Sequence, residues 1–238
     1  MRDLLKGAPL FQVQSLQCVK KDDLCYRQPM ESCSQYTPTE ELFHSITHGA
    51  GAALAVAGIV LLTAQGGDAW HTVSFSIYGA SLTLLFLAST LYHSFREERL
   101  KRFFRHFDHL SIFLLIAGTY TPVTLISLRG PWGWTLFGLI WGFALGGIVY
   151  ELLFLGRYRR ITVAIYLGMG WLALIAVKPM LTMIPHGLFW WLLAGGLFYS
   201  GGVFFYVRKK MRYHHVLWHL FVLIGSGCHF LGFYFYLT

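Results

Sequence analysis

Seven long apolar segments divide this chain, and they restrict its fold more than any other feature. They lie at about residues 43–64, 72–95, 108–127, 133–155, 161–178, 187–207 and 216–237. A helix needs about 20 apolar residues to cross the hydrocarbon core of a membrane, which is about 30 Å thick. Only 13% of the residues are charged, against about 25% in soluble domains. We therefore predict an all-α membrane protein, a bundle of seven transmembrane helices.

Lysine and arginine are distributed very unevenly over the links between these segments. Five lie in the first 36 residues, five follow the second segment, three follow the fourth and four follow the sixth. Only Arg129 and Lys178 fall on the other face. Cytoplasmic loops carry such an excess, so we predict the N-terminus inside and the C-terminus outside. The net charge of +8 then reflects topology rather than nucleic-acid binding. The expected location is the cell membrane, and the expected partners are membrane lipids.

A helix-start motif separates the two parts that we predict for the chain. The run Thr37-Pro38-Thr39-Glu40 supplies an N-cap threonine, a proline at the first helical position and the glutamate of a capping box. Residues 1–36 show no clear apolar period and are expected to form a loosely ordered cytoplasmic arm. Residues 37–238 are expected to form the seven-helix domain.

Ionisable side chains lie inside several apolar segments, all near the same predicted end. His93 closes the second segment, and Asp108 is expected in the first turn of the third. His215 and His219 lie one helical turn apart at the start of the seventh, and Ser89 shares a face with His93. Because successive helices run in opposite directions, all of these residues are expected at the cytoplasmic end. Ionisable groups inside membrane spans are costly and therefore indicate function.

Three histidines and a carboxylate at one depth match the requirements of a zinc site. Neutral imidazoles bind zinc at about 2.0–2.1 Å, and three of them leave a fourth position for water, whose pKa zinc lowers to about 7. The predicted ligands are His93, His215 and His219. Asp108 could hold this water, accept its proton or orient a ligand, and Ser89 could bond the water or a substrate carbonyl. The alternative is that these groups only hydrogen-bond neighbouring helices together.

A second polar cluster stands at the start of the first apolar segment. It consists of Glu41, His44 and His48, with the two histidines one helical turn apart. These residues could support the zinc ligands from behind or form a second metal site. They could also be interfacial residues that cap the helix and face lipid headgroups. The sequence leaves these three interpretations open.

Several motifs together resemble one known family. They are Glu41-x-x-His44-Ser45-x-x-His48, Ser89-x-x-x-His93 followed by Asp108, Gly118-Thr119-Tyr120-Thr121-Pro122, and His215-x-x-x-His219 with His229. This set resembles the hemolysin III proteins of bacteria, which belong with the progestin and adipoQ receptors, including the adiponectin receptors. The resemblance covers about residues 38–238. One position departs from it, because His44 stands where many relatives carry Asn.

The resemblance implies both an architecture and a chemistry. It implies a seven-helix bundle with its N-terminus inside, and zinc on His93, His215 and His219. It also implies that Asp108 lies near the zinc-bound water, with Ser89 beside it. The family is grouped with alkaline ceramidases in a proposed superfamily of membrane hydrolases. The bacterial branch is named for cytolytic activity and has been linked to membrane-lipid homeostasis.

Three functions follow as hypotheses. The first is a zinc-dependent, ceramidase-like hydrolase of a lipid amide or ester that enters laterally from the membrane. The second is a cytolytic or pore-forming protein with structural zinc, although a pore needs a polar stripe and the fourth to sixth segments have almost none. The third is a lipid-sensing receptor. An inside N-terminus argues against an ordinary G-protein-coupled receptor, and residues 216–238 contain no lysine for a retinal Schiff base.

Overall fold

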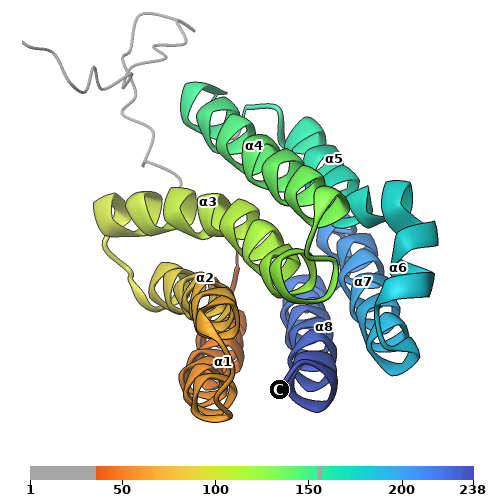
Figure 1. Cartoon of the computed structure of the whole chain (residues 1–238). Helices are drawn as coiled ribbons and strands as arrows, with labels where there is room; N and C mark the ends of the chain where they lie inside the picture. Colours follow the sequence, from red (N-terminus) through yellow and green to blue (C-terminus); the bar gives the residue numbers. More distant parts are fainter. Residues whose placement is uncertain (1–35, 155–156) are drawn as a thin grey trace, which may run out of the picture. The chain divides into compact units, whose positions relative to one another are not determined.

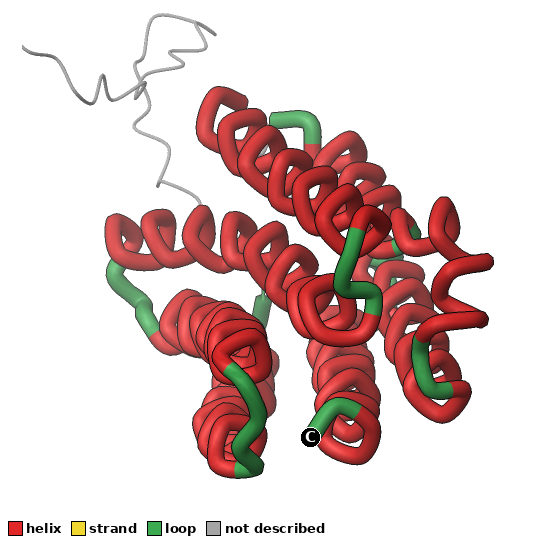
Figure 2. The backbone as a smooth tube through the Cα atoms, viewed as in Figure 1, coloured by secondary structure: helices red, strands yellow, loops and turns green. Residues whose placement is uncertain are grey.

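Every regular element in the described part of the chain is a helix (Figure 2). The structure is a computed structural model that describes residues 36–154 and 157–238. The interpretation of residues 1–36 as a loosely ordered arm therefore lies, apart from Tyr36, outside the described residues. The helices are α1 (Pro38–Ala64), α2 (Ala69–Ser94), α3 (Glu98–Pro122), α4 (Pro131–Phe154), α5 (Arg159–Gly170), α6 (Val177–Met183), α7 (His186–Val207) and α8 (His214–Tyr236). Two short elements, η1 (Val123–Ser127) and η2 (Leu172–Ala176), complete the set.

These helices form seven segments that are long and apolar enough to cross a membrane. Five of the segments are single helices. The third runs from Glu98 to Ser127 and combines α3 with η1, and the fifth runs from Arg159 to Met183 and combines α5, η2 and α6. The prediction of an all-helical, multi-pass membrane protein with seven spans is confirmed.

The first helix begins as its sequence motif predicts. Thr37 is the N-cap, Pro38 occupies the first turn, and the Thr37 hydroxyl accepts a hydrogen bond from the Glu40 backbone N–H at 3.3 Å. In return, the Glu40 carboxylate accepts one from the Thr37 backbone N–H at 3.0 Å. This reciprocal capping satisfies two N–H groups that the helix itself leaves without partners.

The third span begins earlier than predicted and ends, as predicted, at residue 127. It begins at Glu98 instead of residue 108, which places Asp108 in the third turn and corrects its expected position in the first. Residues 98–102 (Glu-Arg-Leu-Lys-Arg) favour the helical conformation, so the helix begins before the continuous apolar run. At the other end, Pro122 closes α3, and a π-helical turn, Val123–Ser127, follows. A proline removes a backbone donor, and the chain accommodates Pro122 with a wider helical turn directly after it.

The fifth span is broken, whereas the apolar run predicted one continuous helix. An α-helix ends at Gly170, a 3₁₀ turn covers Leu172–Ala176, and a short helix resumes at Val177. Gly168 and Gly170 lower helical propensity. Pro179 cannot donate to the carbonyl four residues earlier, so the α-helical ladder cannot run through this point.

The first span packs against both the second and the last span. α2 packs against both α1 and α3, and α8 contacts both α1 and α7 (Figure 1). The helices α1, α3, α5 and α8 begin, and α2, α4 and α7 end, on one side of the bundle. We call this side the basic end, since the links there carry most of the described lysines and arginines.

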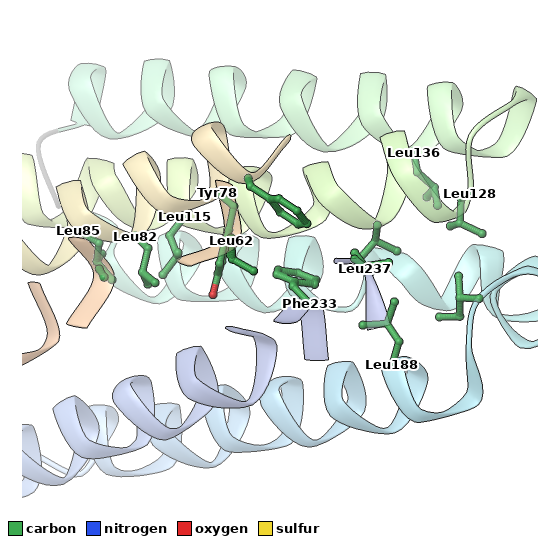
Figure 3. Close-up of a cluster of buried hydrophobic side chains, with 14 of the residues drawn as sticks. Leu62, Tyr78, Leu82, Leu85, Leu115, Leu128, Leu136, Leu188, Phe233 and Leu237 are labelled. Atoms are coloured by element: carbon green, nitrogen blue, oxygen red, sulfur yellow. The ribbon is translucent and has the colours of Figure 1, made fainter. Parts of the chain in front are cut away.

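The apolar core occupies the interior between these spans. Leu62, Tyr78, Leu188 and Phe233 come from four different helices and are almost completely buried (Figure 3). Lipid tails are as apolar as leucine, so this core stabilises the bundle through close packing rather than through removal from water.

Candidate metal centre

Three buried histidines from two helices converge at the basic end. His93 lies in the last turn of α2, and His215 and His219 lie in the first two turns of α8. One nitrogen from each ring lies within 4.8 Å of the others. The ring centroids are 4.7–5.3 Å apart. The structure thus brings together the three predicted ligands, and this buried triad could bind a metal ion.

Neighbouring side chains leave the correct nitrogens available. His93 Nδ1 lies 2.6 Å from Glu41 Oε2, so Nδ1 carries the proton and donates it to the carboxylate. His219 Nδ1 lies 3.3 Å from the Thr47 hydroxyl, which already donates to backbone carbonyls and therefore accepts from His219. Both rings consequently present an unprotonated Nε2. Hydrogen bonds of this kind orient and polarise metal-ligating histidines.

The fit to a metal ion rests on nitrogen atoms that no other group satisfies. His93 Nε2 and both ring nitrogens of His215 are buried, and none has a hydrogen-bond partner among the described residues. A buried polar atom without a partner costs about 1–3 kcal/mol. Three imidazole donors are a typical set for zinc with an open position. The residues therefore fit the predicted group.

The predicted second polar cluster also lies at this centre. His44 is 0% exposed and His48 is 3% exposed, which excludes the interpretation that they face lipid headgroups. The His44 ring centroid lies 4.4–5.0 Å from those of the three predicted ligands. His48 stacks on His219, with centroids 3.6 Å apart and rings 10° from parallel. Both residues therefore pack directly around the triad.

Glu41 is held by a buried lysine that the sequence analysis did not select. Lys101 Nζ lies 2.8 Å from Glu41 Oε1 and donates to the backbone carbonyls of Tyr92 and Phe95 at 3.2 and 3.4 Å. Glu41, His44 and His93 offer a second set of ligand atoms within 4.8 Å. The ammonium beside Glu41 opposes a second cation there, so the arrangement favours a supporting role for Glu41.

Tyr36 covers the cluster at the basic end. Its ring stacks on His215 with centroids 4.9 Å apart and meets His44 edge-on at 4.8 Å. Burial raises the pKa of the Tyr36 phenol well above its usual range, so the ring stays neutral at physiological pH. This residue lies outside the membrane-spanning segments and had no signal in the sequence beyond its position before the capping box.

Asp108 and Ser89 line a cavity that reaches the triad. The cavity has a volume of about 410 Å³, and His215 and His219 form part of its wall. Asp108 belongs to neither set of grouped ligand atoms, and its role beside the metal stays a prediction. The cavity continues toward His229, which lies deeper on α8 and whose Nε2 donates to the Leu192 carbonyl at 3.2 Å.

A further buried carboxylate on this cavity also escaped the sequence analysis. Glu151 of α4 is 2% exposed; it accepts a hydrogen bond from the Thr162 hydroxyl at 3.0 Å and pairs with His109 Nδ1 at 3.6 Å. Its position inside an apolar segment was the available signal, since carboxylates in membrane spans are rare.

Comparisons with known proteins assign the chain to a family. A family profile described as "Haemolysin-III related" matches residues 36–230. "Hemolysin-3" of Bacillus cereus is 44% identical over 201 residues, which cover 83% of this chain and 91% of that protein. "Hemolysin-3 homolog" of Bacillus subtilis is 44% identical over 204 residues, with 84% and 96% covered. "Monocyte to macrophage differentiation factor" of Homo sapiens is 31% identical over 211 residues, with 85% and 87% covered. On these grounds the chain belongs to the haemolysin-III related family.

Proposed function

We propose that this protein is a zinc-dependent hydrolase of the cell membrane that cleaves an amide or ester bond of a lipid. The observation that carries the proposal is the buried triad of His93, His215 and His219 at the edge of a cavity that also contains Asp108 and Ser89. Three histidines are the donor set of catalytic zinc sites that keep an open position. Bound zinc would polarise the carbonyl of a substrate and make hydroxide available at neutral pH.

The residues of the chain would divide the remaining work. The Asp108 carboxylate takes a proton from the attacking water and returns it to the leaving nitrogen or oxygen as the carbonyl bond to that atom breaks. The Ser89 hydroxyl donates a hydrogen bond to the carbonyl oxygen. Apolar side chains of the cavity, among them Ile112 and Val222, accommodate the acyl chain. The substrate enters laterally from the membrane, and the cleavage contributes to membrane-lipid homeostasis.

The first test is the metal content of the protein purified in detergent. We expect about one zinc per chain, and none when His93, His215 and His219 are all replaced by Ala. Retention of zinc by this triple variant, or its absence from the wild type, would overturn the proposed site. The fold of each variant is checked by circular dichroism.

The second test separates catalysis from metal binding. Asp108→Asn is expected to retain zinc and to lose at least about 100-fold in lipid hydrolysis, because general acid–base catalysis contributes about 10²–10⁴-fold. Equal hydrolysis by the variant would remove Asp108 from the mechanism. Absence of hydrolysis by the zinc-loaded wild type, across ceramide, acyl-ester and acyl-amide lipids, would leave a lipid-sensing receptor as the better function.

The name of a relative favours one further candidate, cytolysis with a structural metal, since this chain is 44% identical to "Hemolysin-3". A pore needs polar groups along several spans, and the spans α4 and α7 contain few. Release of haemoglobin from erythrocytes by the purified protein tests this function. Lysis that persists in Asp108→Asn would favour it over hydrolysis.

A further inference from the structure

The cavity beside the triad has two chemically different ends. Much of its lining is apolar and includes Leu115 of α3, Leu167 of α5 and Val222 of α8. At the basic end, which we take as its opening, the lining includes Arg105 of α3, Arg159 at the start of α5 and Lys209 in the link before α8. An occupant that satisfies both ends must join an apolar chain to an anionic group.

The cations at this opening have no acidic partner in the ranges that the structure covers. No carboxylate lies within 4.0 Å of the charged nitrogens of Arg105, Arg159 or Lys209 there. The like charge of Arg159 is the main cause of a lowered pKa at Lys209. Two cations therefore lie close enough to repel each other, and an anion between them would relieve this repulsion.

Arg159 is held in a fixed orientation rather than being free to move in solvent. Its Nε donates to the Tyr206 hydroxyl at 2.8 Å, and its guanidinium lies 4.5 Å from the centroid of the Tyr206 ring. These contacts use one edge of the guanidinium and leave other N–H donors for a ligand. A preorganised arginine binds phosphate oxygens more effectively than a mobile one.

The acidic residues on the same cavity do not cancel this site. Glu151 is already engaged with Thr162 and His109. Asp108 lies beside Ser89 and near enough to Arg159 to interact with its charge, but Asp108 and Arg159 form no ion pair within 4.0 Å. Positive residues at this end also serve topology, but Arg160 and Lys210 do not line the cavity, whereas their sequence neighbours Arg159 and Lys209 do. The neighbours therefore provide matched controls.

We propose that the cavity binds an acylated lipid with a phosphate-bearing, anionic headgroup, and that Arg159, Lys209 and Arg105 form the phosphate subsite. Three cations match the double negative charge of a phosphomonoester better than the single charge of a carboxylate. In such a lipid the ester carbonyl lies only a few bonds from the phosphate. Binding of the phosphate at the opening then directs the carbonyl toward Asp108 and the acyl chain toward the apolar wall. This inference deepens the proposed hydrolase function by naming its substrate class.

Binding is tested in the Asp108→Asn protein, so that turnover plays no part. The four probes are oleoyl lysophosphatidic acid, oleoyl lysophosphatidylcholine, oleate and inorganic phosphate, each competing with a fluorescent fatty acyl probe. Lysophosphatidic acid is expected to bind at least about tenfold more tightly than oleate or lysophosphatidylcholine, since a charge-assisted hydrogen bond is a strong one. Equal affinity for oleate would overturn the phosphate subsite. Competition by inorganic phosphate as strong as that by lysophosphatidic acid would show an ion site without a lipid.

Substitutions then locate the subsite. Arg159→Gln and Lys209→Gln are each expected to weaken lysophosphatidic acid binding about tenfold and to leave lysophosphatidylcholine binding unchanged. Arg160→Gln and Lys210→Gln are expected to change neither. Equal losses in all four variants would mean that general surface charge attracts the lipid, and would overturn the proposal. Lys209 is exposed, so its variant tests the subsite even where Arg159→Gln fails to fold.

The phosphate subsite and the hydrolase function can each fail without the other. Hydrolysis of uncharged lipids without headgroup selectivity would overturn the phosphate subsite and leave the hydrolase intact. Selective binding of lysophosphatidic acid without hydrolysis of any acylated phospholipid by the zinc-loaded wild type would support the subsite and overturn the hydrolase.

Discussion

At the scale of single residues, the centre depends on a series of polar contacts that links three helices. Lys101 of α3 holds Glu41 of α1, which in turn orients His93 of α2. Each of the two carboxylate oxygens of Glu41 has its own partner, His93 for Oε2 and Lys101 for Oε1. Breaking such a buried pair leaves an uncompensated charge. The histidine spacing could be read from sequence, but this support could not, because Lys101 stands in a run of basic residues that indicates topology.

Replacement of Glu41 tests this support. Glu41→Gln is expected to weaken zinc binding by about 10–100-fold, as loss of a partner behind a ligating histidine does. The amide cannot accept from both His93 and Lys101, so His93 loses its fixed orientation. The measurement is the zinc Kd by competition with a chromophoric chelator. Glu97→Gln, at an exposed position without a side-chain capping bond, is the matched control, and an unchanged Kd in Glu41→Gln would contradict the role.

At the scale of elements, small residues determine how closely the helices approach. A Cβ added at Gly118 of α3 would lie 2.1 Å from Ser81 Oγ and 2.9 Å from Ser81 Cβ of α2. Helix α3 carries Asp108, and helix α2 carries Ser89 and His93. The sequence shows Gly118 as part of a motif. Only the packing shows that α2 and α3 can approach this closely because Gly118 has no side chain.

Substitution by alanine tests this contact. Gly118→Ala is expected to destabilise the bundle by about 1–3 kcal/mol, the usual cost of overpacking, and to lower the thermal unfolding temperature in detergent. Gly142→Ala is the control, because a Cβ at Gly142 of α4 meets nothing within 4 Å. An unfolding temperature of Gly118→Ala equal to that of the control would show that α2 and α3 adjust without cost.

At the scale of the whole molecule, charge asymmetry predicts the orientation in the membrane. The basic end holds the triad and the cavity opening, so an inside N-terminus places the chemistry on the cytoplasmic side. This orientation remains a prediction. It decides which leaflet supplies the substrate.

Cysteine labelling tests the orientation. In a variant whose four native cysteines are replaced, Thr238→Cys at the C-terminus is expected to react with a membrane-impermeant maleimide on intact cells. Lys210→Cys in the link before α8 is expected to react only after permeabilisation. The reverse pattern would place the metal centre on the outer side.

The sequence by itself determined the features that depend on local composition and spacing. Apolar length specified seven spans, the capping motif specified the start of α1, and the one-turn spacing of His215 and His219 specified a shared face. Alternating helix direction was enough to bring His93 to the same depth. These inferences succeeded because helical periodicity and membrane thickness act on short stretches of chain.

Only the tertiary structure decided which faces meet. It buried His44 and His48 against the triad, paired Lys101 with a glutamate 60 residues away in the chain, and placed Glu151 on the cavity. It also divided the fifth span, where an apolar run had indicated a continuous helix. The rotation of each helix about its axis follows from packing against neighbours that are distant in sequence. The hydropathy of a segment does not identify those neighbours.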